Sequence, residues 1–201
     1  MIDRRQLLTA LAASAAVPLL PAVARAQSVD DVRAEVVDPK NAPVLGNGQG
    51  DVTLVEFFDY NCHFCRQNTP ALTKVLAEDK GLRVIMREWP VFGPGSEFAA
   101  AAALAAMAQR TYWPMHRALM GAKGRLDEAA VLRLAAEAGV DTARLRADLT
   151  APAVTDHLAK SERLANIIGL QGTPTFIVGE QMHFGLASEA DLRDMIAAAR
   201  R

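Results

Sequence analysis

The sequence predicts an α/β fold in which a βαβ unit and a ββα unit flank an all-helical block. Val52–Phe58 is apolar on both faces, as expected of a strand in the middle of a sheet. Residues 96–169 carry only helical patterns. Thr175–Val178 and Met182–Phe184 then resume the sheet, and Ser188 is the predicted N-cap of one last helix.

The first 26 residues predict an export signal rather than part of the fold. Arg4 and Arg5 precede an uncharged run rich in alanine and leucine, which is similar to the signals of the twin-arginine pathway. Small residues precede Gln27, so cleavage is expected after Ala26, and Arg25 beside that site would hinder the Sec route. An uncleaved anchor is the alternative, since about 17 apolar residues could barely span a bilayer, but two prolines in the run argue against it.

The composition fits one domain with an ordinary core. The chain has 201 residues, with 22 basic and 23 acidic side chains and a net charge of −1. Without residues 1–26 the charge is −3, from 19 basic and 22 acidic side chains. This charge is too small to suggest nucleic acid or anionic lipid as a partner. Two cysteines in an exported protein would usually be oxidised, so the compartment alone does not establish redox catalysis.

Residues 27–50 are interpreted as an N-terminal arm. Asp30–Val37 could form a short helix or strand, and the prolines, asparagines and glycines that follow predict an irregular lead-in. Residues 51–95 hold the buried strand, a helix over Gln67–Leu76 and a strand over Leu82–Glu88. Charged and apolar residues alternate in that last strand, which predicts that it is half-exposed.

The all-helical block is predicted from apolar stripes and capping signals. Phe98–Ala108 is eleven apolar residues, too short to cross a membrane, and predicts a closely packed helix. A helix over Trp113–Met120 follows. Asp127 and Asp141 are the predicted N-caps of the next two helices, each with a hydrophobic staple. Pro152 suits the first turn of a further helix.

The only two cysteines, Cys62 and Cys65, fall where the buried strand gives way to a helix. Residues three apart on a helix have Cβ atoms about 5–6 Å apart, so a disulfide can open and close here with little backbone movement. A helix N-terminus favours a thiolate. Cys62 is therefore predicted to be the exposed nucleophile and Cys65 the buried resolving thiol.

Glu56 interrupts the apolar strand six residues before Cys62. A buried carboxylate is costly unless it is neutral or partnered. A proton acceptor beneath the redox pair would explain this residue, so Glu56 is a third candidate catalytic residue.

Other roles for the cysteine pair have weaker support. A structural disulfide across two residues closes too small a loop to stabilise the fold much. A zinc site needs four ligands, whereas Cys62, His63 and Cys65 offer three at most. No metal or cofactor is expected, but a copper-handling binding protein that uses these three residues as soft ligands remains an alternative.

The chain resembles the DsbA-like thioredoxin-fold family in two motifs, and within it looks most similar to the ScsC-type and Com1-type envelope proteins. The motifs are Val-Glu-Phe-Phe-Asp-Tyr-Asn-Cys-x-x-Cys, ending at Cys65, and Gly-Thr-Pro-Thr-Phe at residues 172–176. The resemblance runs from about Asn41 to the C-terminus. It implies a thioredoxin-like domain made of residues 51–95 and 170–201, with residues 96–169 as a helical insertion.

The resemblance also implies further site residues. Pro174 matches the cis-proline loop that faces the active-site cysteines, where Thr173 would expose its backbone to an extended substrate chain. His63 and Phe64 depart from the DsbA pattern, which places proline first and histidine second. His63 could stabilise a thiolate when protonated, and Phe64 could offer an apolar contact to unfolded chains.

The prediction is therefore a periplasmic thiol–disulfide oxidoreductase that acts on protein cysteines. The expected partners are cysteine-containing client proteins and a membrane redox partner, of DsbB type for an oxidase or of DsbD/ScsB type for an isomerase or reductase. Thr173 resembles the isomerases, since oxidases more often carry valine there. The arm is too short for the oligomerisation stalk of longer ScsC-type relatives, which favours a monomer.

Overall fold

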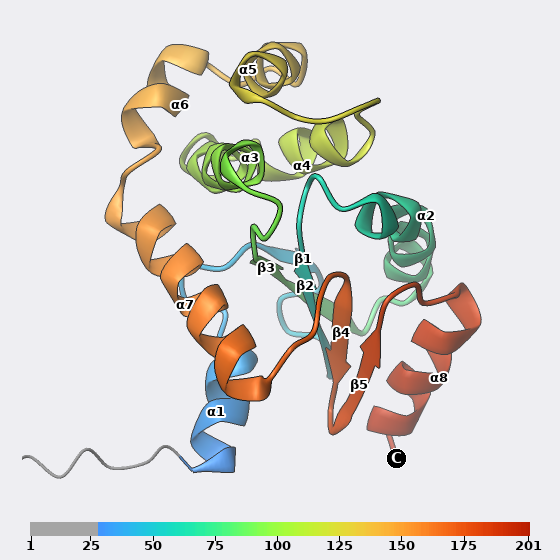
Figure 1. Cartoon of the computed structure of the whole chain (residues 1–201). Coiled ribbons are helices and arrows are strands. Elements are labelled where there is room, and N and C mark those ends of the chain that lie inside the picture. Colours follow the sequence, from blue (N-terminus) through green and yellow to red (C-terminus); the bar gives the residue numbers. More distant parts are fainter. Residues whose placement is uncertain (1–27) are drawn as a thin grey trace, which may run out of the picture.

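A computed structural model describes residues 28–201 (Figure 1). The predicted export signal, with Arg4, Arg5 and the cleavage after Ala26, lies outside the described residues. No helix within residues 28–201 is both long enough and apolar enough to cross a bilayer.

A five-stranded mixed sheet forms the centre of the molecule, in the order β1-β3-β2-β4-β5. β2 and β3 are parallel, and the other neighbouring pairs are antiparallel. β2 lies in the middle, so its apolar sequence on both faces is explained by burial on both faces. The strands are β1 (Val44–Gly46), β2 (Val52–Phe58), β3 (Leu82–Glu88), β4 (Thr175–Val178) and β5 (Gln181–Phe184).

Helices cover both faces of the sheet. α2 (His63–Glu78) and α8 (Glu189–Ala199) pack on one face, and α1 (Val29–Val36) and α7 (Pro152–Ile168) lie on the other (Figure 1). Two apolar cores result: Leu54 and Phe58 belong to the larger one, whereas Val55 and Phe57 belong to the smaller one. Because alternate residues of a strand face opposite ways, β2 contributes to both cores.

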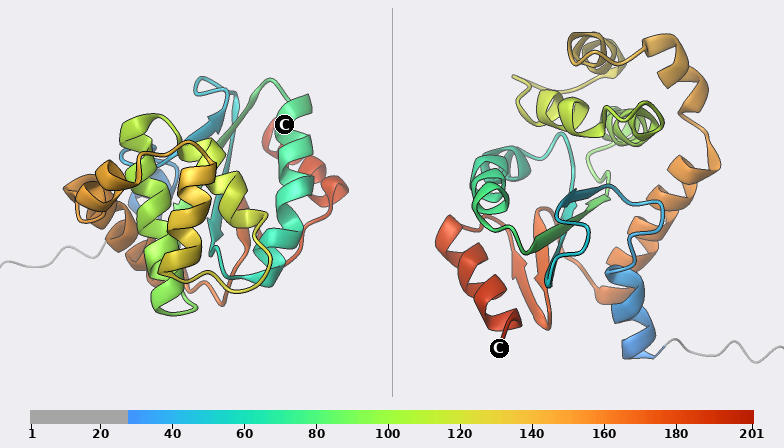
Figure 2. Two further views of the ribbon diagram at one scale, coloured as in Figure 1. Left: turned by 90° about the horizontal axis from the view of Figure 1, so that it is seen from above. Right: turned by 180° about the vertical axis from the view of Figure 1, so that it is seen from behind.

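The inserted helical block lies above the end of the sheet at which β2 and β3 finish (Figures 1 and 2). Asp127 accepts a hydrogen bond from Ala130 N at 2.8 Å and Asp141 accepts one from Ala143 N at 2.9 Å, so both predicted N-caps are confirmed. The predicted α/β fold with an inserted helical block is confirmed as well. Before α7 the block holds α3 (Pro94–Ala105), a short 3₁₀ helix (Ala106–Gln109), α4 (Tyr112–Met120), α5 (Glu128–Glu137) and α6 (Thr142–Asp148).

Two predictions about the sheet are wrong. β3 is buried along most of its length rather than half-exposed, and the segment after Val37, predicted to be an irregular lead-in, supplies β1. β1 pairs with β3 as the edge strand of the sheet. Asp30–Val37, predicted to be a short helix or strand, lies almost entirely in helix α1, which contributes Val36 to the smaller core. Arg87, whose charge suggested exposure, is completely buried in β3 beneath this arm.

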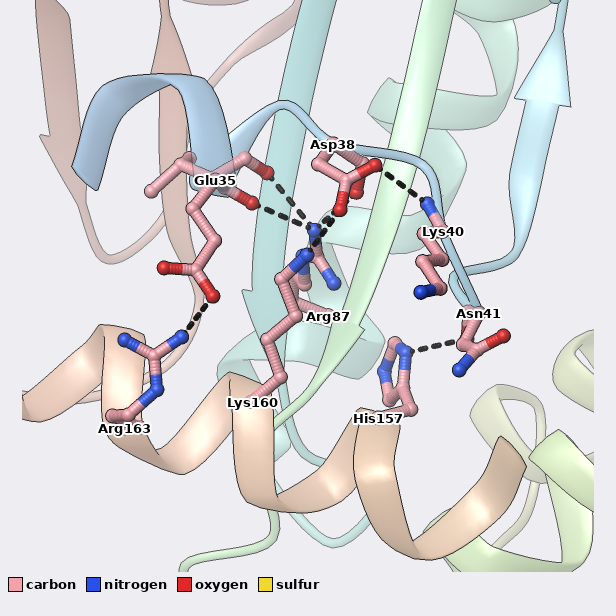
Figure 3. A network of polar contacts seen from close by, with 9 residues as sticks. Glu35, Asp38, Lys40, Asn41, Arg87, His157, Lys160 and Arg163 are labelled. Carbon is pink, nitrogen blue, oxygen red and sulfur yellow. Dashed lines mark hydrogen bonds and ion pairs between the residues drawn. The ribbon is translucent and has the colours of Figure 1, made fainter. Parts of the chain in front are cut away.

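Arg87 binds the arm through the backbone at the end of α1. Its Nη2 donates to carbonyl oxygens of the last turn and of the segment after it (Figure 3). The last carbonyls of a helix lack partners within the helix and carry a partial negative charge, so a guanidinium suits this position. The three acceptors are Glu35 O at 3.3 Å, Val36 O at 3.1 Å and Asp38 O at 2.6 Å.

α7 holds the same arm from a second side (Figure 3). Lys160 Nζ lies 2.6 Å from Asp38 Oδ2, Arg163 pairs with Glu35, and His157 Nδ1 lies 2.9 Å from the Asn41 carbonyl oxygen. The segment from Ser28 to Ala42 is therefore fixed to β3 and α7 by polar contacts as well as by the smaller core.

Candidate active site

Cys62 is the N-cap of α2. Its Sγ accepts a hydrogen bond from Cys65 N at 3.4 Å and lies 3.2 Å from the Thr173 carbonyl oxygen, to which it donates when it is protonated. Sulfur thus takes the place that a serine or aspartate oxygen occupies at many helix N-termini. The two cysteines are free thiols in this structure.

The two thiols have opposite proton affinities. A hydrogen bond from the Cys65 thiol, supported by backbone N–H groups and the Thr173 side chain, outweighs burial and lowers the pKa of Cys62 to about 6. Burial, the same hydrogen bond and the nearby Glu56 raise the pKa of Cys65 far above its usual range. At neutral pH the pair therefore holds one thiolate, on Cys62, and one thiol.

Cys62 is not the exposed residue that the sequence predicted. It is 3% exposed, against 0% for Cys65, because the loop of Thr173 and Pro174 covers its sulfur. The difference in reactivity between the two cysteines thus rests on thiolate formation rather than on exposure.

Alkylation tests this difference directly. In the reduced native protein at pH 6–7, iodoacetamide should modify Cys62 at least about a hundredfold faster than Cys65, because only the thiolate attacks. Peptide mapping by mass spectrometry measures the two rates. In the denatured protein the two rates should converge, and equal rates in the native protein would contradict the assignment of Cys62 as the nucleophile.

The loop of Thr173 and Pro174 faces the redox pair as the family motif implied. The peptide bond between these two residues is cis. Gly185 N donates to the Pro174 carbonyl at 2.8 Å, which fixes the loop to the residue after β5. The Thr173 hydroxyl is buried, and the Thr173 side chain helps to lower the pKa of Cys62.

Glu56 lies on β2 behind the pair and is 3% exposed. Burial, the charge of Glu88 and the charge of Cys62 raise the pKa of Glu56 to about 8. A cavity of about 10 Å³ adjoins its side chain, and this volume is close to what one water molecule needs. Most residues that line the cavity are apolar, but Thr69, Thr73 and His116 also line it. Glu56 can therefore hold a proton at neutral pH in a largely apolar site.

The loop before Cys62 is held by side chains that the sequence analysis did not assign. Asp59 accepts hydrogen bonds from Val91 N at 2.7 Å, Phe92 N at 3.1 Å and Ser96 Oγ at 2.7 Å. Asn61 accepts one from Leu126 N at 2.7 Å. Asp59 and Asn61 break the apolar pattern of β2, which was a visible signal, but their partners in the helical block are distant in sequence.

Arg66 also holds this loop, and nothing in the sequence marks it. Its Nε donates to the Tyr60 carbonyl at 2.7 Å, and its Nη1 donates to the Gly124 carbonyl at 2.6 Å. Arg66 thereby ties the loop before Cys62 to the loop between α4 and α5 and places a guanidinium next to the redox pair.

The surface around the pair is apolar. His63 and Phe64 are exposed, with ring centroids 5.8 Å apart, and Phe64 is 52% exposed. Val91, Phe92 and Leu186 add exposed apolar side chains from segments bonded to Asp59 and to the Pro174 loop. Within residues 28–201, no group of three or more His, Cys, Asp or Glu side chains is arranged to hold a metal ion.

A family profile described as "DSBA-like thioredoxin domain" matches residues 53–197. Among curated proteins, a Na(+)/H(+) antiporter NhaA from Salinispora tropica is 33% identical over 151 residues, which are 74% of this chain and 23% of that protein. The chain thus spans about a quarter of the length of the curated relatives it matches.

Solved structures also match. A thioredoxin-like oxidoreductase from Silicibacter pomeroyi is 46% identical with a TM-score of 0.82, and the match covers 84% of this chain and 97% of that one. A periplasmic thioredoxin-like protein from Salmonella enterica (TM-score 0.76, covering 87% and 98%) and the catalytic domain of Proteus mirabilis ScsC (TM-score 0.76, covering 85% and 95%) are each 24% identical and show the fold alone.

Proposed function

The chain belongs to the DsbA-like thioredoxin domain family, and from this premise we propose that it is a periplasmic thiol–disulfide oxidoreductase acting on the cysteines of other proteins. The family resemblance predicted from the two motifs is confirmed. The observation that carries the proposal is the position of Cys62 Sγ, which caps α2 and faces the Thr173 carbonyl. A client cysteine bound along that loop would meet the same sulfur.

We infer that exchange proceeds through a mixed disulfide. A client thiolate attacks Cys62 of the oxidised pair, the Cys62–Cys65 bond breaks, and Cys65 leaves with the electron pair and takes up a proton. Glu56 behind the pair is the proposed source of that proton. A second client thiolate then attacks the mixed disulfide, which releases the oxidised client and leaves Cys62 as a thiolate. Two electrons have passed from the client to the pair.

The geometry favours the oxidase direction. The contacts that lower the pKa of Cys62 to about 6 stabilise the reduced form of the pair, and a stabilised reduced form makes the disulfide a stronger oxidant. The threonine at position 173 is more typical of isomerases, and this residue is the feature that favours the isomerase direction. A membrane partner of DsbB type is accordingly proposed to reoxidise the pair.

Trapping the redox state in cells tests this direction. Acid quenching followed by alkylation with a mass-tagged maleimide should show Cys62 and Cys65 mostly oxidised in the periplasm. Deletion of a DsbB-type partner should shift the pair to the reduced form. A pair that is mostly reduced in unmodified cells would instead establish an isomerase or reductase, supplied with electrons by a DsbD/ScsB-type partner.

Export by the twin-arginine route is part of the proposal. Replacing Arg4 and Arg5 together by lysine should stop the processed form from appearing in the periplasm, because that pathway reads the arginine pair. Mass spectrometry of the unmodified protein should find Gln27 at the N-terminus. Undiminished processing of the double variant would instead indicate Sec export.

Client chains are proposed to bind the apolar surface around Cys62, formed by Phe64, Val91, Phe92 and Leu186. Unfolded clients expose apolar side chains, so such a surface suits them without sequence specificity. A monomer is proposed as well. The arm packs back on its own β3 and α7 rather than extending as a stalk.

A further inference from the structure

A second buried carboxylate lies close to Glu56. In the parallel pair of β2 and β3, Glu56 is opposite Met86 and Phe58 is opposite Glu88. Alternate residues of a strand share one face, so Glu56 and Glu88 are diagonal neighbours on one face, roughly 7–8 Å apart. Both residues are almost completely buried. Two carboxylates at this distance in an apolar interior disfavour each other's ionisation.

Glu88 is held by side chains from two different helices. The Tyr112 hydroxyl of α4 donates to Glu88 Oε1 at 2.6 Å, and His157 Nε2 of α7 lies 2.8 Å from Glu88 Oε2. Both side chains of the Glu88–His157 pair are fully buried. Burial pushes the pKa of Glu88 upward, but His157 and Tyr112 more than offset it, so that the pKa is lowered.

The arm orients the His157 ring. Its Nδ1 lies 2.9 Å from the Asn41 carbonyl oxygen, which can only accept a hydrogen bond (Figure 3). Nδ1 is therefore the donor in this contact, and Nε2 is left facing Glu88 Oε2 at 2.8 Å. Since the pKa of Glu88 is lowered, its carboxylate holds the negative charge of this network.

Other titratable groups also face these two carboxylates. The charge of Cys62 raises the pKa of Glu56, and the charge of Glu56 raises the pKa of Cys65. Tyr60 contacts both Tyr112 and Glu88. His116 of α4 lines the cavity beside Glu56, and burial lowers its pKa to about 4, so it is neutral. Burial is the largest cause of the raised pKa of Glu56, followed by the charge of Glu88 and then by the charge of Cys62.

We propose that Glu88, held in place by Tyr112 and His157, is a positioning residue of the active site whose carboxylate helps Glu56 to keep its proton at neutral pH. The inference rests on the proposed role of Glu56 as the proton carrier of Cys65. Glu88 acts only through Glu56. Without the charge of Glu88, a larger fraction of Glu56 would be ionised near neutral pH and unable to protonate Cys65 as it leaves.

Infrared titration of the oxidised protein tests the proposal, because the disulfide keeps both cysteines from titrating. The carbonyl band of the protonated Glu56 is identified by its loss in Glu56→Gln. In Glu88→Gln, which keeps the shape of the side chain and removes its charge, the midpoint of that band should fall by about one pH unit. Asp156→Asn, which removes an exposed carboxylate next to His157 in the sequence, should leave the midpoint unchanged.

A midpoint in Glu88→Gln that is unchanged or higher overturns the proposal. If that variant does not fold, the double variant Glu88→Gln with His157→Gln also removes the carboxylate and keeps amides that can pair, and it should show the same fall. The titration needs no catalytic activity. Failure of the wild-type protein to form mixed disulfides would therefore refute the proposed function but not the effect of Glu88 on Glu56. An unchanged midpoint in Glu88→Gln would refute that effect but not the proposed function.

Discussion

Replacing Cys62 by serine should abolish thiol–disulfide exchange, whereas replacing Cys65 by serine should trap the mixed disulfide between Cys62 and a client. Serine is a good N-cap, so Cys62→Ser should keep α2 and the fold while losing the sulfur that meets the client. Cys65→Ser keeps the nucleophile but cannot resolve the mixed disulfide. Insulin reduction and refolding of a reduced disulfide-bonded protein measure the activity, and non-reducing gels show the trapped clients.

Circular dichroism of both variants serves as the control for folding. Mixed disulfides that accumulate with Cys62→Ser instead of Cys65→Ser would reverse the two roles. Residual exchange in Cys62→Ser at more than about a thousandth of the wild-type rate would show that Cys62 is not essential.

Glu56→Gln should slow the attack of Cys65 on a mixed disulfide, which is the reverse of the step in which Cys65 leaves, by about a hundredfold, the usual contribution of a positioned acid or base. The wild-type rate at which Cys65 resolves a mixed disulfide should rise with pH toward pH 8, because Glu56 accepts the proton only when it is ionised. Glutamine cannot accept that proton, so the variant should lose this rise. Single-turnover kinetics over pH 5–9 measure it, with the exposed Glu97→Gln as the matched control.

The same variant should be more stable than the wild type, and increasingly so as the pH rises. The pKa of Glu56 is about 8 in the folded chain, above its ordinary value. Folding of the wild type therefore loses stability as the pH rises from about 4.5 to 8, by a few kcal/mol at most. Thermal unfolding of the oxidised proteins should show a larger difference in stability between the variant and the wild type at pH 8 than at pH 5. If the two proteins have equal stabilities and resolve mixed disulfides at equal rates, Glu56 is not a proton carrier.

The parts of the site that depend on local sequence were predictable. Cys62 and Cys65 are brought together by helix geometry over four residues, and Glu56 is conspicuous because its strand neighbours are apolar. The capping residues Asp127, Asp141 and Ser188 likewise act within their own helices. Such features need no information about how distant segments meet.

The parts that depend on tertiary contacts were not predictable. Arg87 looked like an exposed residue of a half-buried strand, because nothing in Leu82–Glu88 shows that α1 supplies carbonyl acceptors for it. β1 was missed because three residues between glycines and prolines give too short a pattern. Nothing in the sequence around His157 shows that its ring lies between Asn41 and Glu88, because these two residues come from other parts of the chain.

The pairing of β2 with β4 has a consequence for synthesis of the chain. Leu54 pairs with Val178, so the strand that leads to the redox pair acquires one of its neighbours only after the helical block has been made. Loop closure over such a separation slows folding. Until then β2 has an open edge, and Cys62 lacks the Thr173 carbonyl that covers its sulfur. A nascent chain should therefore carry an uncovered thiol next to an unpaired strand.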